Sequence, residues 1–170
     1  SMLPEIRRRV KEGRWEVTAS TWVEPDKNMS GTESMVRHIL YTKNYLSSLL
    51  GISPDSMELD FEPDTFGHSE CIPEILSQGG VKYYYHCRGF EKYSLYRWRA
   101  PSGEEVLVNR DSAWYLGPVE YDRVLRLPQY SKENHCDTLL YVYGVGDHGG
   151  GPTRRDIEKI VDMKQWPFMP

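Results

Sequence analysis

The order of apolar segments constrains the fold of this 170-residue chain more than any other feature. Runs typical of strands alternate with runs that have helical spacing. The strand-like runs are 15–20, 56–61, 81–86 and 138–145, and the helical ones are 3–12, 32–50, 70–78, 119–127 and 153–165. This alternation predicts an α/β fold with a largely parallel sheet covered by helices. Ligands of such sheets bind just beyond the carboxyl ends of the strands.

Three segments carry the strongest local signals. Apolar residues recur at helical spacing over 32–50, and Gly51 follows as a stop. The strand-like runs 93–98 and 106–109 flank Ala-Pro-Ser-Gly, which predicts a β-hairpin inserted into the parallel sheet. The nearly continuous apolar run 138–145 is typical of a strand buried on both faces.

Composition excludes several partners. With 21 Lys and Arg against 25 Asp and Glu, the net charge of −4 offers no basic field for nucleic acid or an anionic membrane. No stretch approaches the roughly 18 apolar residues of a membrane-spanning helix, and no apolar signal core is present. Cys71, Cys87 and Cys136 include no pair at CxxC spacing. We therefore expect reduced thiols in a cytoplasmic protein.

Three polar clusters follow the predicted strands. Residues 62–69 combine carboxylates, an aromatic ring, a glycine and an imidazole, which suits a nucleophile or metal ligand, or simply a helix cap. The glycine-rich segment 144–153 presents Asp147 and His148 without the lysine of a P-loop, so it is a ligand loop or a tight turn. Residues 22–28 suit a polyhydroxylated ligand or an ordinary surface loop. We interpret His38 and His86 as structural.

Four blocks together resemble glycoside hydrolase family 38, the zinc-dependent retaining α-mannosidases. They are residues 22–28, 33–38, 63–69 and 146–153, in the order and with the spacing of that family. The most specific block reads Asp-Thr-Phe-Gly-His-Ser and begins at Asp64. The resemblance implies an α-mannoside or oligosaccharide as substrate.

The resemblance also implies the architecture. Residues 1–170 would be a partial catalytic domain, part of the seven-stranded β/α barrel that these enzymes share with polysaccharide deacetylases. The family's opening His-x-Asp strand and its downstream His-Asp block have no counterpart here, and the chain stops at 166–170 where another strand is due. We therefore expect an incomplete barrel whose exposed strand edges favour self-association.

The resemblance assigns roles to single residues. Asp64 would be the catalytic nucleophile and a zinc ligand, and Asp147 the general acid/base. Phe66, Arg88 and Trp22 would bind the substrate. A retaining glycosidase needs two such carboxyl groups about 5–5.5 Å apart.

Only Asp64 matches one of the four zinc ligands of the family, so we expect a complete zinc site only in a longer parent protein. His68 or His148 could substitute for a missing ligand. Two other hypotheses stay open. One is a metal-dependent deacetylase on the related barrel, and the other is a non-catalytic carbohydrate-binding or structural remnant.

Overall fold

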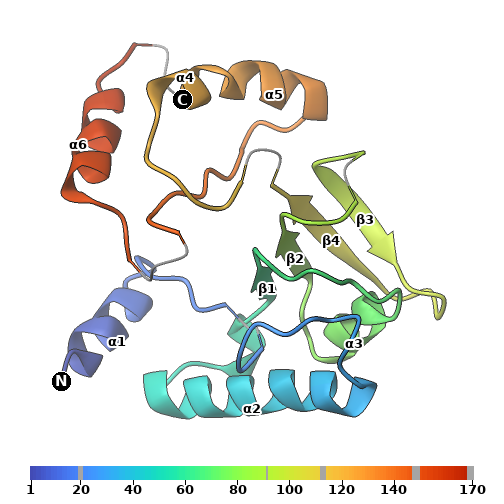
Figure 1. Ribbon diagram of the computed structural model, residues 1–170. Coiled ribbons are helices and arrows are strands. Elements are labelled where there is room, and N and C mark those ends of the chain that lie inside the picture. The colour runs from blue at the N-terminus through green and yellow to red at the C-terminus, as the bar shows by residue number, and fades with distance from the viewer. Residues whose placement is uncertain (19–20, 91, 112–113, 147–149, 168–170) are drawn as a thin grey trace. The chain divides into compact units, whose positions relative to one another are not determined.

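The chain divides into two compact units, Ser1–Arg110 and Asp111–Pro170 (Figure 1). The computed structural model describes residues 1–18, 21–90, 92–111, 114–146 and 150–167. Unit 1 denotes Ser1–Arg110 and unit 2 denotes Asp111–Pro170, and each is described by itself. In the part of the chain described, no helix is long and apolar enough to cross a membrane.

A four-stranded sheet organises unit 1. Its strands are β1 (Leu59–Glu62), β2 (Tyr83–His86), β3 (Leu95–Arg99) and β4 (Glu105–Arg110), in the order β1-β2-β4-β3. The strands β1, β2 and β4 are parallel, and β3 runs antiparallel to β4. The predicted mixed α/β fold, with its mostly parallel strands and a hairpin, is therefore confirmed. The sheet alone does not form a closed barrel.

Helices α2 (Thr32–Leu50) and α3 (Ile72–Gln78) pack against one face of this sheet. Helix α1 (Leu3–Lys11) packs against α2, and the short 3₁₀ turn η1 spans Pro54–Ser56. Ile39 of α2 and Leu76 of α3 join Tyr84 and Val108 of the sheet in one buried cluster. Helix α2 ends as predicted, because Gly51 adopts a left-handed conformation with φ of 71°.

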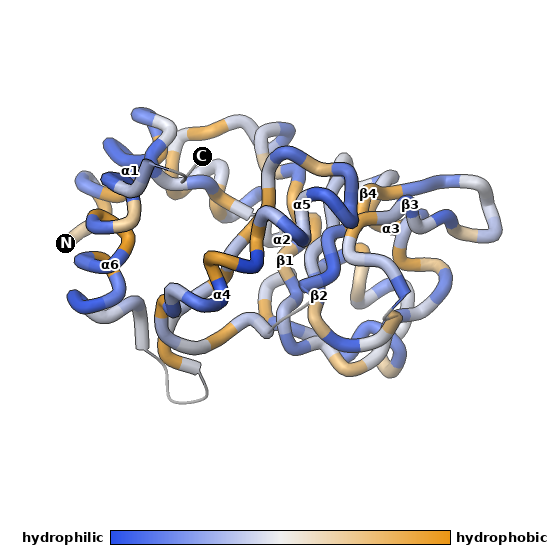
Figure 2. The backbone as a smooth tube through the Cα atoms, turned by 90° about the horizontal axis from the view of Figure 1, so that it is seen from above, coloured by the Kyte–Doolittle hydropathy of each residue, from blue (hydrophilic) through white to orange (hydrophobic). Residues whose placement is uncertain are grey.

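Unit 2 is built from helices α4 (Tyr121–Leu125), α5 (Leu127–Asn134) and α6 (Arg154–Met163). Val119, Val124 and Met163 form its buried cluster. A capping box begins α6: the Thr153 hydroxyl accepts the Asp156 N–H, and the Asp156 carboxylate accepts the Thr153 N–H. Figure 2 shows the alternation of apolar and polar residues along α6.

Two predicted strands are wrong where the structure describes them. Residues 15–18 and 138–145 are not strands, and the second run makes only an isolated bridge between Gly117 and Gly144. Its Leu140 and Val145 side chains are 53% and 49% exposed. An apolar run becomes a buried strand only where neighbouring strands take up its backbone polar groups. Residues 19–20 lie outside the described residues.

Candidate active site

The carboxyl ends of β1 and β2 meet at one edge of the sheet. Glu62 and His86 are register partners at these ends, and both strands point the same way. Asp64 follows two residues after Glu62, and Arg88 follows two residues after His86. The parallel topology therefore brings the side chains of Asp64 and Arg88 to the same edge, as expected for a ligand site in such a sheet.

Asp64, Arg88 and Phe66 are in direct contact. The Arg88 Nε atom donates to Oδ1 of Asp64 at 2.6 Å, and the Nη2 atom forms an ion pair with the same oxygen at 2.5 Å. The Arg88 guanidinium also lies over the Phe66 ring, 4.4 Å from its centroid. The Phe66 side chain is 70% exposed, and both charged side chains are partly exposed. The arrangement gives an oriented carboxylate beside an accessible aromatic face, so three residues predicted from sequence come together.

The loop 21–28 supports the segment that carries Asp64. Oε1 of Glu24 accepts the backbone N–H of Asp64 at 2.7 Å. The loop also approaches the backbone so closely that a Cβ on Gly67 would overlap with the Cβ of Asn28. Gly67 is thus required by this close contact, and the loop fixes the backbone on both sides of Phe66.

A buried charged cluster lies beneath this loop. The Lys27 ammonium contacts the Asp60 carboxylate and lies 3.2 Å from Oε1 of Glu62, and all three side chains are at most 2% exposed. The hydroxyls of Thr21 and Thr65 lie 2.8 and 3.0 Å from the two Glu62 oxygens. Burial, together with the nearby Asp60 carboxylate, raises the pKa of Glu62 to about 8. The cluster therefore anchors the loop to β1.

Two histidines converge on the backbone of Arg88. The Arg88 carbonyl oxygen lies 3.0 Å from Nε2 of His68 and 2.6 Å from Nδ1 of His86. Because a carbonyl only accepts, both ring nitrogens donate to it, and in the neutral rings the other nitrogens accept from the Tyr84 and Tyr96 hydroxyls, each at 2.9 Å. This network fixes the position of the Arg88 backbone, from which the guanidinium group reaches Asp64.

The pKa shifts of these four groups agree with this assignment. Burial lowers the pKa of His68 and lowers that of His86 to about 4. Burial also raises the pKa of Tyr84, and it raises that of Tyr96 to about 12. Both rings are therefore neutral at about pH 7, and both phenols keep the proton that they donate. The structural interpretation of His86 agrees with these bonds.

Trp22 lies against α2. Its backbone N–H donates to Nδ1 of His38 at 3.0 Å, and its ring meets the edge of the Tyr45 ring, with centroids 5.2 Å apart. His38 thus has a structural partner. The role of Trp22 in substrate binding stays a prediction.

Asp147 and His148 lie outside the described residues. The predicted distance between the Asp64 and Asp147 carboxyl groups therefore stays a prediction. The assignment of Asp147 as acid/base stays a prediction, as does a metal-binding role for His148.

The described side chains do not fit a zinc ion. No group of three His, Cys, Asp or Glu residues in the described ranges could hold a metal ion. Oδ1 of Asp64 is taken up by Arg88, and both nitrogens of His68 have hydrogen-bond partners. Structural and catalytic zinc sites use three or four protein ligands. In the described residues both ring nitrogens of His68 are taken up by Arg88 and Tyr84, and a metal-binding role for His68 stays a prediction.

Neither the Lys27 cluster nor the support of Asp64 by Glu24 is predicted from the sequence. One signal was available, because Asp60 and Glu62 alternate along β1 and so share one face of the sheet. Two carboxylates on the buried face of a strand require a cation. Nothing local in the sequence identifies Lys27 as that cation.

The fold of the chain is shared with two solved α/β structures. An alpha-mannosidase from Enterococcus faecalis V583 superposes with a TM-score of 0.69 at 18% identity, covering 98% of this chain and 20% of that one. A 4-alpha-glucanotransferase from Thermococcus litoralis gives a TM-score of 0.61 at 16% identity, covering 94% and 26%. At these identities the superpositions show a shared fold.

The sequence comparison is more specific. The family model for the glycosyl hydrolases family 38 N-terminal domain matches residues 2–170, so the chain belongs to this family. Alpha-mannosidase G of Dictyostelium discoideum is 28% identical over 179 aligned residues, covering 98% of this chain and 16% of the relative. The chain thus spans about a sixth of that relative's length.

Proposed function

We propose that this chain is part of the catalytic domain of an α-mannosidase, which removes terminal α-linked mannose from a mannoside or oligosaccharide. Family membership supports the class of enzyme. The observation that carries the proposal is the Asp64 carboxylate at the sheet edge, oriented by Arg88 beside the exposed Phe66 ring.

The proposed reaction proceeds with retention through a covalent mannosyl intermediate. Arg88 binds Oδ1 of Asp64, and no described group donates to Oδ2, which would attack the anomeric carbon. The Phe66 ring would pack against the C–H face of the sugar. Asp147 would protonate the leaving oxygen and then activate water.

The proposal includes the complete barrel and its zinc site. The four-stranded sheet would be one part of a seven-stranded barrel completed by a longer parent protein. Zinc would bind only in that parent, because the described residues offer Asp64 without companion ligands. We assign no step of the reaction to the metal.

Covalent trapping tests the proposal. A fluorinated mannosyl fluoride should label the parent enzyme on Asp64, and Asp64→Asn should lose both labelling and hydrolysis of an aryl α-mannoside. The matched control is Asp26→Asn, which removes a carboxylate from the neighbouring loop. This variant should still be labelled on Asp64. Labelling of another residue, or full activity of Asp64→Asn, would contradict the role of Asp64.

The same variant tests the carbohydrate-binding alternative. A binding protein would hold its sugar equally well with Asn at position 64 and would hydrolyse nothing in either form. The isolated chain should turn over little aryl α-mannoside. Hydrolysis by the chain alone at the rate of the parent would refute the view that it is one part of an active site.

A further inference from the structure

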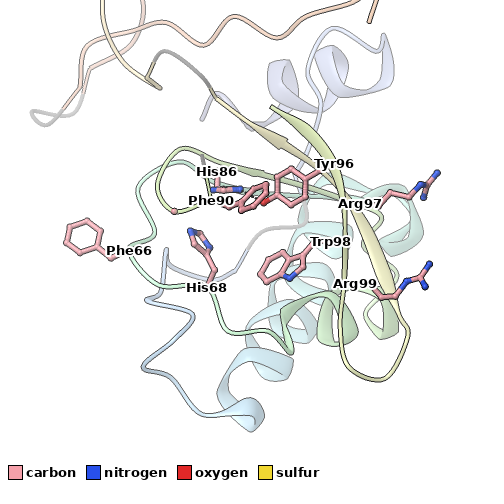
Figure 3. A pocket seen from close by; sticks show the side chains of 9 residues that line it. Phe66, His68, His86, Phe90, Tyr96, Arg97, Trp98 and Arg99 are labelled. Carbon is pink, nitrogen blue, oxygen red and sulfur yellow. Dashed lines mark hydrogen bonds between the residues drawn. The ribbon is translucent and has the colours of Figure 1, made fainter. Parts of the chain in front are cut away.

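A pocket of about 530 Å³ opens beside the Phe66 ring. Its walls come from the segment after β1, the end of β2 with the following turn, and β3 (Figure 3). Four aromatic side chains line it: Phe66, Phe90, Tyr96 and Trp98. Its volume lies within the range of roughly 300–1,000 Å³ that is usual for small-molecule sites.

The two histidines in the pocket wall have no free nitrogen. His68 and His86 each donate to the Arg88 carbonyl and accept from a tyrosine hydroxyl. Their low pKa values keep both rings uncharged at about pH 7. The wall is therefore rigid and neutral, and it offers neither a metal ligand nor a general base.

The charged groups that line the pocket are directed elsewhere. Arg97 and Arg99 contribute to the wall, but their guanidinium groups pair with Glu105 at 3.0 Å each. Figure 3 shows both groups pointing away from the rings of His68 and Trp98. An anionic ligand would therefore meet no free cation in the interior of the pocket.

Two kinds of contact remain for a ligand. The side chains of Phe90 and Trp98 are partly exposed, and within the described ranges no group accepts from the indole N–H of Trp98. The Tyr96 oxygen, which donates to His86, can still accept a hydrogen bond. Aromatic faces with one donor and one acceptor suit an uncharged, hydroxylated ring, which has an apolar C–H face and hydroxyl groups on its edge.

The pocket is contiguous with Asp64 but separate from it. Phe66 belongs to its rim and also contacts Arg88, which holds Asp64. Asp64 itself does not line the pocket. We propose that this pocket binds a second sugar ring of an oligosaccharide whose terminal mannose lies at Asp64. The inference rests on the proposed function, and it makes Phe90 and Trp98 determinants of oligosaccharide specificity.

Titration with an α-linked mannobiose tests the inference on the 170-residue chain. The indole N–H resonances of the five tryptophans, observed by ¹H–¹⁵N NMR, show where the sugar binds. We expect the Trp98 resonance to shift and saturate, and methyl α-mannoside to bind more weakly at the pocket than the disaccharide. An unmoved Trp98 resonance at saturating disaccharide would overturn the inference.

Matched variants separate the pocket from the rest of the surface. Phe90→Ala should weaken mannobiose binding about fivefold, because it removes one aromatic face. Tyr83→Ala removes a ring of similar exposure (45% against 48%) that does not line the pocket, and it should leave the affinity unchanged. Equal affinities for the two variants would refute the assignment. Dispersed spectra verify that both variants fold.

The failure of the proposed function has a different signature. If the parent enzyme neither hydrolyses mannosides nor becomes labelled on Asp64, while mannobiose still shifts Trp98, the pocket stands as a carbohydrate site and the enzymatic proposal falls. If labelling of Asp64 succeeds and Trp98 does not respond, the pocket assignment falls and the enzymatic proposal stands.

Discussion

Unit 1 and unit 2 differ in the secondary structure and the buried cluster that stabilise each of them. Unit 1 has a four-stranded sheet and a cluster of buried apolar residues that includes Met57, Ile72 and Tyr84. The described residues of unit 2 form helices around a smaller buried cluster of Val119, Val124 and Met163. Both units were predicted to contribute strands with a catalytic carboxylate at their ends. In unit 1 the paired strands β1 and β2 fix the position of the segment that carries Asp64, whereas Asp147 of unit 2 lies outside the described residues.

This difference separates the two halves of the proposed reaction. Asp64 is held by contacts to Arg88 and Glu24, which belong to two other segments of unit 1. The described part of unit 2 ends its apolar run 138–145 without strand partners, just before Asp147. The Asp64 carboxylate is thus oriented by contacts within unit 1, whereas the role of Asp147 as acid/base stays a prediction.

The largest expected effect is on the stability of unit 1, through Lys27. Lys27→Met leaves the Asp60 carboxylate buried without its cation, beside Glu62, which its raised pKa keeps protonated at neutral pH. Removing one partner from such a buried cluster costs about 3–5 kcal/mol. Urea unfolding of the chain, followed by circular dichroism, measures the loss.

Lys82→Met is the matched control, because the Lys82 side chain is 63% exposed in its pair with Glu58. It should change the free energy of unfolding far less than Lys27→Met. Equal losses in the two variants would mean that the buried cluster does not anchor the loop 21–28.

The second prediction concerns pH and His86. The unfolded ring titrates at its ordinary pKa of 6.5 and the folded ring at about 4, so the unfolded state binds more protons between these values. Stability should therefore fall as the pH falls from 6.5 to 4, by at most about 3 kcal/mol from this group. His86→Gln, which stays neutral, should lack this part of the pH dependence.

Glu62 contributes with the opposite sign. Its ordinary pKa of 4.5 is raised to about 8, so the folded state binds more protons in this range, and its contribution is lost as the pH rises through 8. Both proteins contain Glu62, so its contribution cancels when the free energy of unfolding of His86→Gln is subtracted from that of the wild type at each pH. A difference that stays constant from pH 7 to pH 4 would refute the assignment of a neutral, buried His86.

Local signals in the sequence account for what could be predicted of the fold. Helical spacing and Gly51 define α2, and the turn residues between β3 and β4 define the hairpin. The position of Asp64 also followed, because a short motif lies directly after a strand. Each of these features depends on neighbouring residues along the chain.

Non-local contacts account for what was missed. The pairing of Lys27 with Asp60 joins residues 33 positions apart, and it forms only because the loop 21–28 lies over β1. The run 138–145 has the composition of a buried strand but lacks the partners that a strand needs. The composition of a segment shows which secondary structures it can adopt, and the neighbouring strands determine whether it forms a strand.

The third prediction compares two glycines of unit 1 that have the same φ angle. Gly89 and Gly103 both have φ of 96°, but a Cβ on Gly89 would lie 3.1 Å from Cδ2 of His68, whereas a Cβ on Gly103 meets nothing within 4 Å. Gly103→Ala should cost about 1–2 kcal/mol from backbone strain alone. Gly89→Ala should cost more, because it also displaces His68 from the Arg88 carbonyl. Equal free energies of unfolding would show that this histidine moves freely.

The smallest effect is expected in unit 2, at the capping box of α6. Thr153→Ala removes the hydroxyl that accepts the Asp156 N–H, and a lost N-cap costs about 1 kcal/mol. Thr153→Ser keeps this hydroxyl and is the control. Amide hydrogen exchange over 154–163 should accelerate in the first variant and not in the second. A loss as large as that of Lys27→Met would overturn the contrast between the units, because α6 would then depend on its cap as strongly as unit 1 depends on its buried ion pairs.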